Sequence, residues 1–441
     1  MTAGRANPLI TSSPAWLGGF VGLAIALRPT LVVLGIAAVG VALVGLVFPT
    51  SLVGLMFVAV LFDRLGVTGM NVASFPITAS KLSVLGGLGL WGVRAGLGGG
   101  PLLRWHPALW ALSGIVVMTA VSVAFHDCMA SGKYTLFGLG MMTVLVAFVY
   151  TVLAEAPLQG LFRFLAAALI AVCLLSLAPS SGGRASGTLG DPNEWGTMVL
   201  LLTPTILGGL AEDRYALARP LRVALFLLFP LVVMRTGSRS AFVVGLVILP
   251  ACVYLLRRHR GELAAGITLA AIAAPFAIGL SATIERIQKL LGNLQGTAVI
   301  PDTSLDERTE LFRQGWDLFV ESWLVGAGPG TFPEATGFLS TMGELRPAHN
   351  SYMEIVCEQG VLGMVPFVIL AVVVAHTLRR AYQTAQDETS RSRVLGVSFG
   401  LIAVVLMAGT LGLLTFSMAF LALGLALAVA AQAQGTHVRT S

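Results

Sequence analysis

The sequence predicts an all-α polytopic membrane protein, with roughly 12–14 transmembrane helices and one long external loop that contains an amphipathic helix. Composition is the first observation behind this prediction, because 56% of the 441 residues are apolar and only 11% are charged. A soluble domain carries about 25% charged residues. The second is the mean hydropathy of +0.87. The third is a series of apolar runs that approach or reach the ~20 residues needed for one helix to cross a bilayer.

Short polar links separate the apolar runs, apart from one long polar segment. The run at 51–62 is short and follows Pro49, which indicates a kink or a tight turn there. We divide the chain into N-terminal transmembrane helices at 1–281, a long external loop at 282–348 and C-terminal transmembrane helices at 349–441. The predicted spans are 30–48, 51–62, 80–97, 107–125, 134–153, 161–178, 194–211, 221–234, 240–256, 263–281, 351–377, 394–411 and 413–431, with a weaker candidate at 15–27.

The Lys and Arg residues predict the orientation of the helices, because cytoplasmic loops are enriched in these residues. One alternate set of links holds thirteen of them and the opposite set holds six. We therefore expect the 179–192, 235–239 and 282–348 segments to face outward. The larger set is Arg94, Arg104, Arg163, Arg214, Arg219, Arg222, Arg257, Arg258, Arg260, Arg379, Arg380, Arg391 and Arg393; the smaller is Arg64, Lys81, Lys133, Arg184, Arg235 and Arg239.

The long polar segment contains one amphipathic helix, predicted over 304–322. Ser304 followed three residues later by Glu307 forms a capping box, and apolar residues that include Trp316 then recur at helical spacing. A turn-rich connector with glycines from Gly326 to Gly330 leads on toward the next apolar run.

The candidate catalytic stretch begins at His349, where polar residues enter an apolar run. From Asn350 onward, Glu354 and Glu358 recur at four-residue spacing, so a helix that starts there carries a polar stripe that faces a cavity or a partner helix. A neutral imidazole at this position could accept a proton from an alcohol near neutral pH. A structural interpretation stands beside this one, in which Asn350 caps the helix and the glutamates make structural hydrogen bonds.

Three further places offer charged or polar groups. Arg235 and Arg239 flank a very short link, where their planar guanidinium groups suit phosphate oxygens, although they could equally extend to lipid headgroups. Arg308 on the predicted amphipathic helix is a candidate for the same anion or an ordinary solvated charge. Asp191 and Asn193 precede the 194–211 run and could cap its helix or contact a substrate.

Several function classes are excluded by the absence of their patterns in the sequence. No phosphate-binding Gly-x-x-x-x-Gly-Lys loop occurs, and no His, Cys, Asp and Glu spacing indicates a metal site. Basic residues are not interleaved with aromatic ones, so the net charge of +6 does not indicate nucleic-acid binding. We expect no cofactor, no metal and no nucleic-acid partner.

The stretch from His349 to Gly363 resembles the signature of the O-antigen ligase and O-antigen polymerase family. That signature is His, then Asn, Ser or Gln, nine residues, Gly, two residues, and Gly, Thr or Val; here His349-Asn350 is followed by Gly360 and Gly363 at these spacings. The Arg235–Arg239 link resembles the family's preceding arginine loop. The family's Arg-x-x-x-Leu element is not clean, since Arg308 has Leu311 at three and Phe312 at four, whereas Arg286 has Leu290 at four. We assign Arg308.

This resemblance implies a C-type glycosyltransferase-like fold and a glycan donor carried on undecaprenyl diphosphate. It also implies a multi-pass protein of the bacterial plasma (inner) membrane, with its active face toward the periplasm. It implies that His349 is the base that activates a hydroxyl acceptor on a lipid or a glycan, with inversion at the anomeric carbon. The implied diphosphate ligands are Arg235, Arg239 and Arg308, while Asn350 or Glu354 orients the imidazole. The resemblance favours a ligase; a polymerase of the same family, or a flippase for a lipid-linked glycan, is the alternative.

Overall fold

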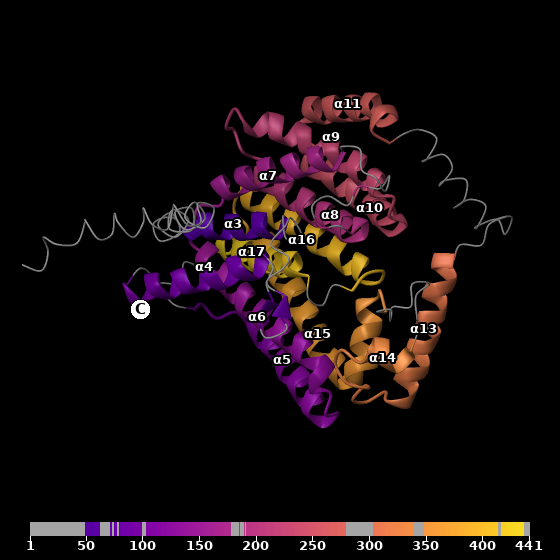
Figure 1. Ribbon diagram of the computed structural model, residues 1–441. Coiled ribbons are helices and arrows are strands. Elements are labelled where there is room, and N and C mark those ends of the chain that lie inside the picture. Colours follow the sequence, from indigo (N-terminus) through magenta and orange to yellow (C-terminus); the bar gives the residue numbers. More distant parts are fainter. Residues whose placement is uncertain are drawn as a thin grey trace, which may run out of the picture.

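The computed structural model describes an almost entirely helical molecule with a short hairpin, β1 (Asn71–Val72) and β2 (Phe75–Pro76) (Figure 1). The predicted runs at 15–27 and 30–48, the first part of the long loop and Arg286 lie outside the described residues. Those described are 49–61, 71–72, 75–76, 79–98, 103–177, 185, 189, 191–278, 303–337, 348–412 and 416–435.

The helices follow the predicted apolar runs to within a few residues at most boundaries. Prolines and polar caps lie at several starts: Pro107 and Pro192 occupy the first turns of their helices, and Asp387 caps another. The helices are α3 (Pro49–Leu61), α4 (Ala79–Gly96), α5 (Pro107–Phe125), α6 (Met129–Leu153), α7 (Gln159–Leu177), α8 (Pro192–Leu210), α9 (Ala218–Thr236), α10 (Arg239–Leu255), α11 (Arg260–Ile278), α13 (Thr303–Glu321), α14 (Phe332–Thr336), α15 (Ser351–Thr384), α16 (Glu388–Ala408) and α17 (Ser417–Ala433).

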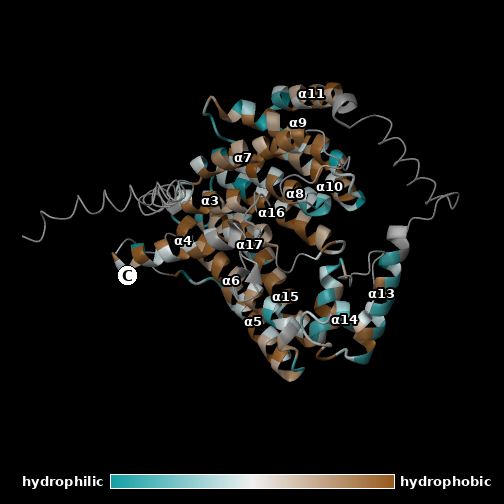
Figure 2. Cartoon of the chain, viewed as in Figure 1, coloured by the Kyte–Doolittle hydropathy of each residue, from teal (hydrophilic) through white to brown (hydrophobic). Residues whose placement is uncertain are grey.

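The prediction of an all-α polytopic membrane protein is confirmed. Among the described residues, five helices (α5, α6, α7, α15 and α16) are long and apolar enough to cross a bilayer, and three shorter apolar helices accompany them. Figure 2 shows hydrophobic colour along most of the bundle and more hydrophilic colour on α13 and α14. The predicted total of 12–14 spans and the three-part division of the chain stay predictions.

Helix α13 confirms the amphipathic helix predicted over 304–322. It starts at Thr303, one residue before Ser304, so the predicted cap residue lies inside the first turn instead of before it. The side chain of Ser304 lies outside those that the structure describes, so the capping box stays a prediction.

Helices α8 and α16 form the centre of the bundle and touch backbone to backbone. A Cβ atom added at Gly208 would lie 2.4 Å from the carbonyl oxygen of Ser392, and one at Gly396 would lie 2.6 Å from that of Pro204. Further along, a Cβ at Gly400 would meet the Leu201 carbonyl oxygen at 2.5 Å. Small residues at these positions allow the helices to approach closely, as in other membrane bundles. Along these contacts the residue numbers rise in α16 as they fall in α8, so the two helices are antiparallel.

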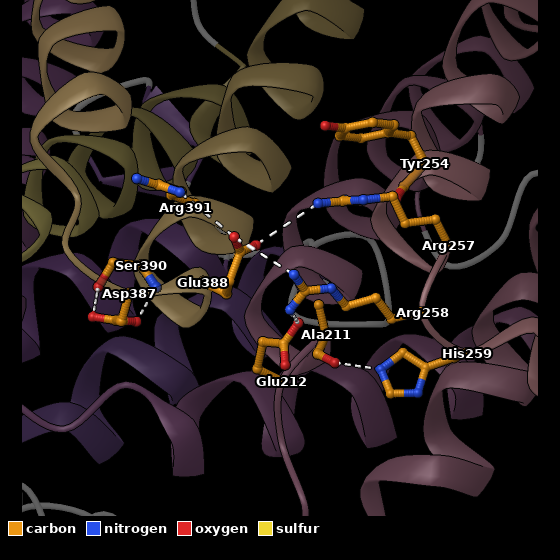
Figure 3. A network of polar contacts seen from close by, with 10 residues as sticks. All are labelled: Ala211, Glu212, Tyr254, Arg257, Arg258, His259, Asp387, Glu388, Ser390 and Arg391. Atoms are coloured by element: carbon orange, nitrogen blue, oxygen red, sulfur yellow. Dashed lines mark hydrogen bonds and ion pairs between the residues drawn. The ribbon is translucent and has the colours of Figure 1, made fainter.

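This antiparallel arrangement defines two ends of the bundle. The start of α8 approaches the α9–α10 link, since a Cβ at Gly196 would lie 2.7 Å from that of Ala241. The end of α16 lies at the same end, which we call the pocket end. The start of α16 lies at the opposite end together with the links that follow α8 and α10 (Figure 3), and we call this the ion-pair end.

The ion-pair end is built from buried and exposed charge pairs. Arg222 donates to both carboxylate oxygens of Glu262 at 2.6 and 2.8 Å, and the two side chains are 4% and 10% exposed. Arg163 binds Asp213 through two hydrogen bonds of 2.7 and 2.8 Å. These hydrogen bonds are the main reason that the pKa of Asp213 lies below its ordinary value. Both pairs join different helices or links of the bundle.

A more exposed network ties the start of α16 to the link after α10. Figure 3 shows Glu388 between Arg257, Arg258 and Arg391, with N–O distances of 3.7, 3.6 and 3.5 Å. Arg258 also reaches Glu212 after α8 at 3.4 Å. Five arginines of the larger predicted set therefore lie at this end of the bundle: Arg163, Arg222, Arg257, Arg258 and Arg391.

Candidate functional site

The start of α15 holds the candidate catalytic histidine in an unusual backbone conformation. His349 has a φ of 49°, in the left-handed region that non-glycine residues rarely adopt. Asn350 follows as the N-cap, and its Oδ1 accepts hydrogen bonds from the amides of Tyr352 and Met353 at 3.0 and 3.2 Å. The predicted capping role of Asn350 is confirmed. Strained residues of this kind cluster at functional sites.

The first turn of α15 is fixed to the end of α16. The hydroxyl of Ser351 donates to the carbonyl oxygen of Leu411 at 2.8 Å, and the hydroxyl of Tyr352 donates to that of Val405 at 2.6 Å. These bonds keep the backbone around His349 at the pocket end of the bundle.

Helix α13 lies against the same turn and forms a second, small hydrophobic core with it. The core includes Leu311 from α13, Phe332 from α14, and Met353 and Cys357 from α15. A Cβ at Gly315 would lie 3.0 Å from Met353, so the helices approach closely there. The thiol of Cys357 donates to the Gly315 carbonyl oxygen at 2.9 Å.

A pocket of about 200 Å3 lies between α13, the start of α15 and the end of α16. Three of the predicted site residues line it: His349, Asn350 and Arg308. They share it with Leu311 and Phe312, which follow Arg308 in its predicted element. The pocket is also lined by residues that nothing in the sequence pattern marks: Ala348, Met353, Gly409 and Thr410. Two segments predicted separately therefore meet at one cavity.

Arg308 differs from the next arginine on the same helix. Arg313 pairs with Glu310 at 2.6 Å and with Asp317 at 3.5 Å. Arg308 is exposed at the pocket, and no ion pair joins it to a carboxylate whose side chain the structure describes. Its charge is therefore available to an anion in the pocket.

Helix α15 breaks at Gly360, whose φ of 64° and ψ of −169° are not helical. The break leaves two amides and two carbonyl oxygens of α15 without their helical hydrogen bonds. The connector after α13 supplies a partner for each of the four. The amides of Val361 and Leu362 donate to the carbonyl oxygens of Trp323 and Leu324 at 2.9 and 3.1 Å. The carbonyl oxygens of Cys357 and Glu358 accept from the amides of Ala327 and Gly328 at 2.8 and 2.9 Å. A broken helix inside a membrane protein requires such replacement partners.

Glycine is required on both sides of this junction. A Cβ at Gly360 would lie 2.4 Å from the backbone of Leu324, and one at Gly326 would lie 2.3 Å from that of Glu358. Both glycines also have positive φ, of 64° and 73°. The glycine eleven residues after His349 in the signature thus has a structural explanation.

The two glutamates of the predicted polar stripe have different surroundings. Glu358 is buried, and its carboxylate accepts from the amides of Gly330 at 2.8 Å and Phe332 at 3.1 Å. It therefore holds the connector and does not face a cavity, so the structural interpretation applies to this residue. Glu354 is half-buried and lies beside Gly412, where an added Cβ would be 3.1 Å from its carboxylate. Neither residue lines the pocket.

The other two predicted arginines lie at the α9–α10 link. Arg235 is half-buried in the last turn of α9, and Arg239 is exposed at the first position of α10. Gly237 between them has a φ of 60°, and Ser238 caps α10. The link is at the pocket end of the bundle, but its arginines do not line the pocket that contains His349.

Asp191 and Asn193 lie at the start of α8. The Asp191 carboxylate accepts hydrogen bonds from the amides of Asn193 and Glu194 at 2.6 and 3.2 Å, which confirms its predicted capping role. The carbonyl oxygen of Asn193 accepts from the hydroxyl of Thr197 at 2.9 Å. Their alternative role in contacting substrate stays a prediction.

Comparison with known proteins supports the family prediction. Residues 223–368 match a family model described as O-antigen ligase. This match supports the resemblance to the O-antigen ligase and polymerase family. The matched segment runs from α9 through the arginine link, α13 and the His349 turn into α15, and so includes the segments that carry the candidate site. The match points to a glycosyltransferase-like membrane enzyme of the ligase and polymerase type.

The remaining comparisons add little to this assignment. A chain from a solved structure titled "Structural coordination of polymerization and crosslinking by a peptidoglycan synthase complex" is similar, with 16% identity over 74% of this chain and 97% of that chain. Its TM-score is 0.43. No curated protein matches the sequence.

Proposed function

We propose that this O-antigen ligase family protein transfers a glycan from undecaprenyl diphosphate to a hydroxyl acceptor at the external face of the plasma membrane. The observation that carries the proposal is the pocket in which His349 and the guanidinium of Arg308 lie together. A base and a phosphate ligand are the two groups that such a transfer needs in one place.

The reaction assigns a separate task to each group. One imidazole nitrogen of His349 accepts the proton of the acceptor hydroxyl, while that oxygen forms a bond to the anomeric carbon. The bond from this carbon to the diphosphate oxygen breaks, and its electron pair stays on the diphosphate. Attack opposite the leaving group inverts the anomeric configuration. Arg308 stabilises the negative charge that develops on the leaving diphosphate.

Arg235 and Arg239 are proposed as the second part of the diphosphate site. Their link lies at the pocket end of the bundle, as does the His349 turn. Helix α10 begins at Arg239, and the positive end of a helix dipole lies at its N-terminus. Asn350 is proposed to orient His349 by fixing the first turn of α15.

The test measures the release of polyprenyl diphosphate by purified protein in detergent, with a polyprenyl-diphosphate glycan and candidate acceptors. His349→Ala should lower the rate by about 10²–10⁴-fold, the usual contribution of a general base. Arg308→Ala should lower it by about 10²–10³-fold, as for the loss of one donor to a developing anion. The chain lengths of the products distinguish a ligase from a polymerase.

Matched controls come from the same helices. His376 is exposed on α15 and Arg313 is exposed on α13, and neither lines the pocket. His376→Ala and Arg313→Ala should transfer glycan at the wild-type rate. Wild-type rates in both His349→Ala and Arg308→Ala would overturn the proposal.

A further inference from the structure

Helix α13 has a face that no described part of the protein covers. Around the helix, one side is buried against α15 and α14 through residues such as Leu311 and Gly315. The opposite side is polar and carries the ion pairs of Arg313. Between the buried side and the polar side, an apolar row runs along α13 at helical spacing and continues to Trp323, just past the end of the helix. This outer apolar stripe consists of Phe312, Trp316, Val320 and Trp323, with exposed fractions of 54%, 53%, 57% and 56%.

The outer apolar stripe continues into the lipid-facing surface of α15. Trp323 and Leu324 pair through their backbones with Val361 and Leu362, just where α15 resumes after its break. From that point α15 presents a long row of exposed apolar side chains, and only 17% of its most apolar segment is buried inside the protein. The row consists of Val361, Leu362, Val365, Val368, Ile369 and Val372.

The chemistry of the stripe suits the boundary between water and hydrocarbon. Tryptophan is enriched at this boundary because its ring is apolar and its indole N–H is polar. A helix with one apolar and one charged face lies in the plane of the interface. The stripe has two tryptophans, whereas the adjacent side of α13 carries Glu310, Arg313, Asp317 and Glu321.

We propose that the outer apolar stripe of α13 lies in the interfacial layer of the bilayer, as a continuation of the lipid-facing side of α15. Phe312 belongs both to the stripe and to the pocket wall. The pocket therefore opens at the membrane surface, where the diphosphate of a lipid-linked donor reaches Arg308 while its tail stays among the lipids. Only this last consequence rests on the proposed glycan transfer.

The test is a nitroxide scan of α13 in lipid nanodiscs, with Cys128 replaced by Ser because it is the only one of the four cysteines that is not buried. Labels at Phe312→Cys, Trp316→Cys and Val320→Cys should be accessible to oxygen and protected from a water-soluble nickel reagent. Matched labels at Arg313→Cys, Asp317→Cys and Glu321→Cys should show the reverse. The ratio of the two accessibilities should thus alternate with the helical period.

Two outcomes would overturn the proposal. Nickel accessibility at all six positions would place the stripe in water, and protection of the stripe from both reagents would show that a protein covers it. The scan needs no glycan transfer, so its failure is distinguishable from failure of the proposed function.

A second measurement covers the case in which a labelled variant does not fold. In nanodiscs that contain brominated lipid, the variant with both Trp316→Phe and Trp323→Phe should lose part of the quenchable tryptophan fluorescence. Trp195→Phe, which changes a tryptophan that is 0% exposed, should lose none of it. An unchanged quenchable signal in the double variant would contradict contact with lipid.

Discussion

The two ends of the bundle use polar groups in opposite ways. At the ion-pair end, cations meet carboxylates: Arg222 binds Glu262, Arg163 binds Asp213, and three arginines surround Glu388. At the pocket end, capping oxygens, glycine turns and backbone pairing across the break in α15 fix the helices. No ion pair joins Arg308 there to a carboxylate whose side chain the structure describes. Charges at one end hold the fold together, whereas Arg308 at the other is available to bind an anion.

This comparison separates stability from activity. Changes at the ion-pair end should lower the free energy of unfolding and leave transfer by the folded protein intact. Changes to the residues that line the pocket should affect transfer more than stability. The four substitutions below test this separation, from the largest expected effect on stability to the smallest.

Arg222→Ala should lower the free energy of unfolding by about 3–5 kcal/mol, because it leaves the buried carboxylate of Glu262 without its cation. Thermal unfolding in detergent measures the change, and transfer per folded molecule should stay at the wild-type value. Arg219→Ala changes an exposed arginine on the same helix and should cost less than about 1 kcal/mol. Equal effects of the two substitutions would break the comparison.

Glu358→Ala should cost about 1–3 kcal/mol, because the amides of Gly330 and Phe332 lose a buried acceptor. Hydrogen exchange at these two amides should become faster, and transfer should fall because the connector supports the wall of the pocket. Glu334→Ala on α14 changes an exposed glutamate and serves as the control. A variant with slow exchange at both amides would show that Glu358 does not hold the connector.

Asp191→Ala should cost about 1 kcal/mol through loss of the α8 cap. Asp191→Ser should restore this stability, since serine caps a helix as well as aspartate does. If the residue only caps, both variants transfer glycan normally once folded. A loss of transfer in Asp191→Ser with restored stability would assign the carboxylate to substrate contact instead.

Arg258→Ala should have the smallest effect, within about 0–1 kcal/mol, because its pairs with Glu212 and Glu388 are exposed. The same thermal unfolding measurement applies, at low and at high salt. High salt should reduce the difference from the wild type, since salt screens exposed charges. A loss comparable to that of Arg222→Ala would show that this network is as important as the buried pair.

Local patterns predicted much of the fold and part of the site. Apolar run length located most helices, and the caps at Asp191 and Asn350 were recognisable because capping depends on residues two or three positions apart. The spacing from His349 to Gly363 indicated the family, and Arg308 was assigned to the segment that meets His349 in the pocket.

The remainder depends on contacts between distant segments, which no local pattern contains. Glu358 matched a polar stripe at helical spacing, yet the break at Gly360 turns this stretch toward the connector. Thr410 lines the pocket only because α16 ends beside the start of α15. The position of Arg235 and Arg239 outside this pocket likewise follows from helix packing and not from their residue types.

The close contact between α8 and α16 has a mechanical consequence for the pocket. With Gly208 and Gly396 in backbone contact, no compressible layer of side chains separates the two helices. Sliding one helix along the other would drive main-chain atoms together, so the position of α16 against α8 is fixed. Gly409 and Thr410, at the end of α16, form one side of the pocket, and that side is held in place with the helix. The α16 side of the pocket is therefore fixed, and α13 and the start of α15 form its other walls.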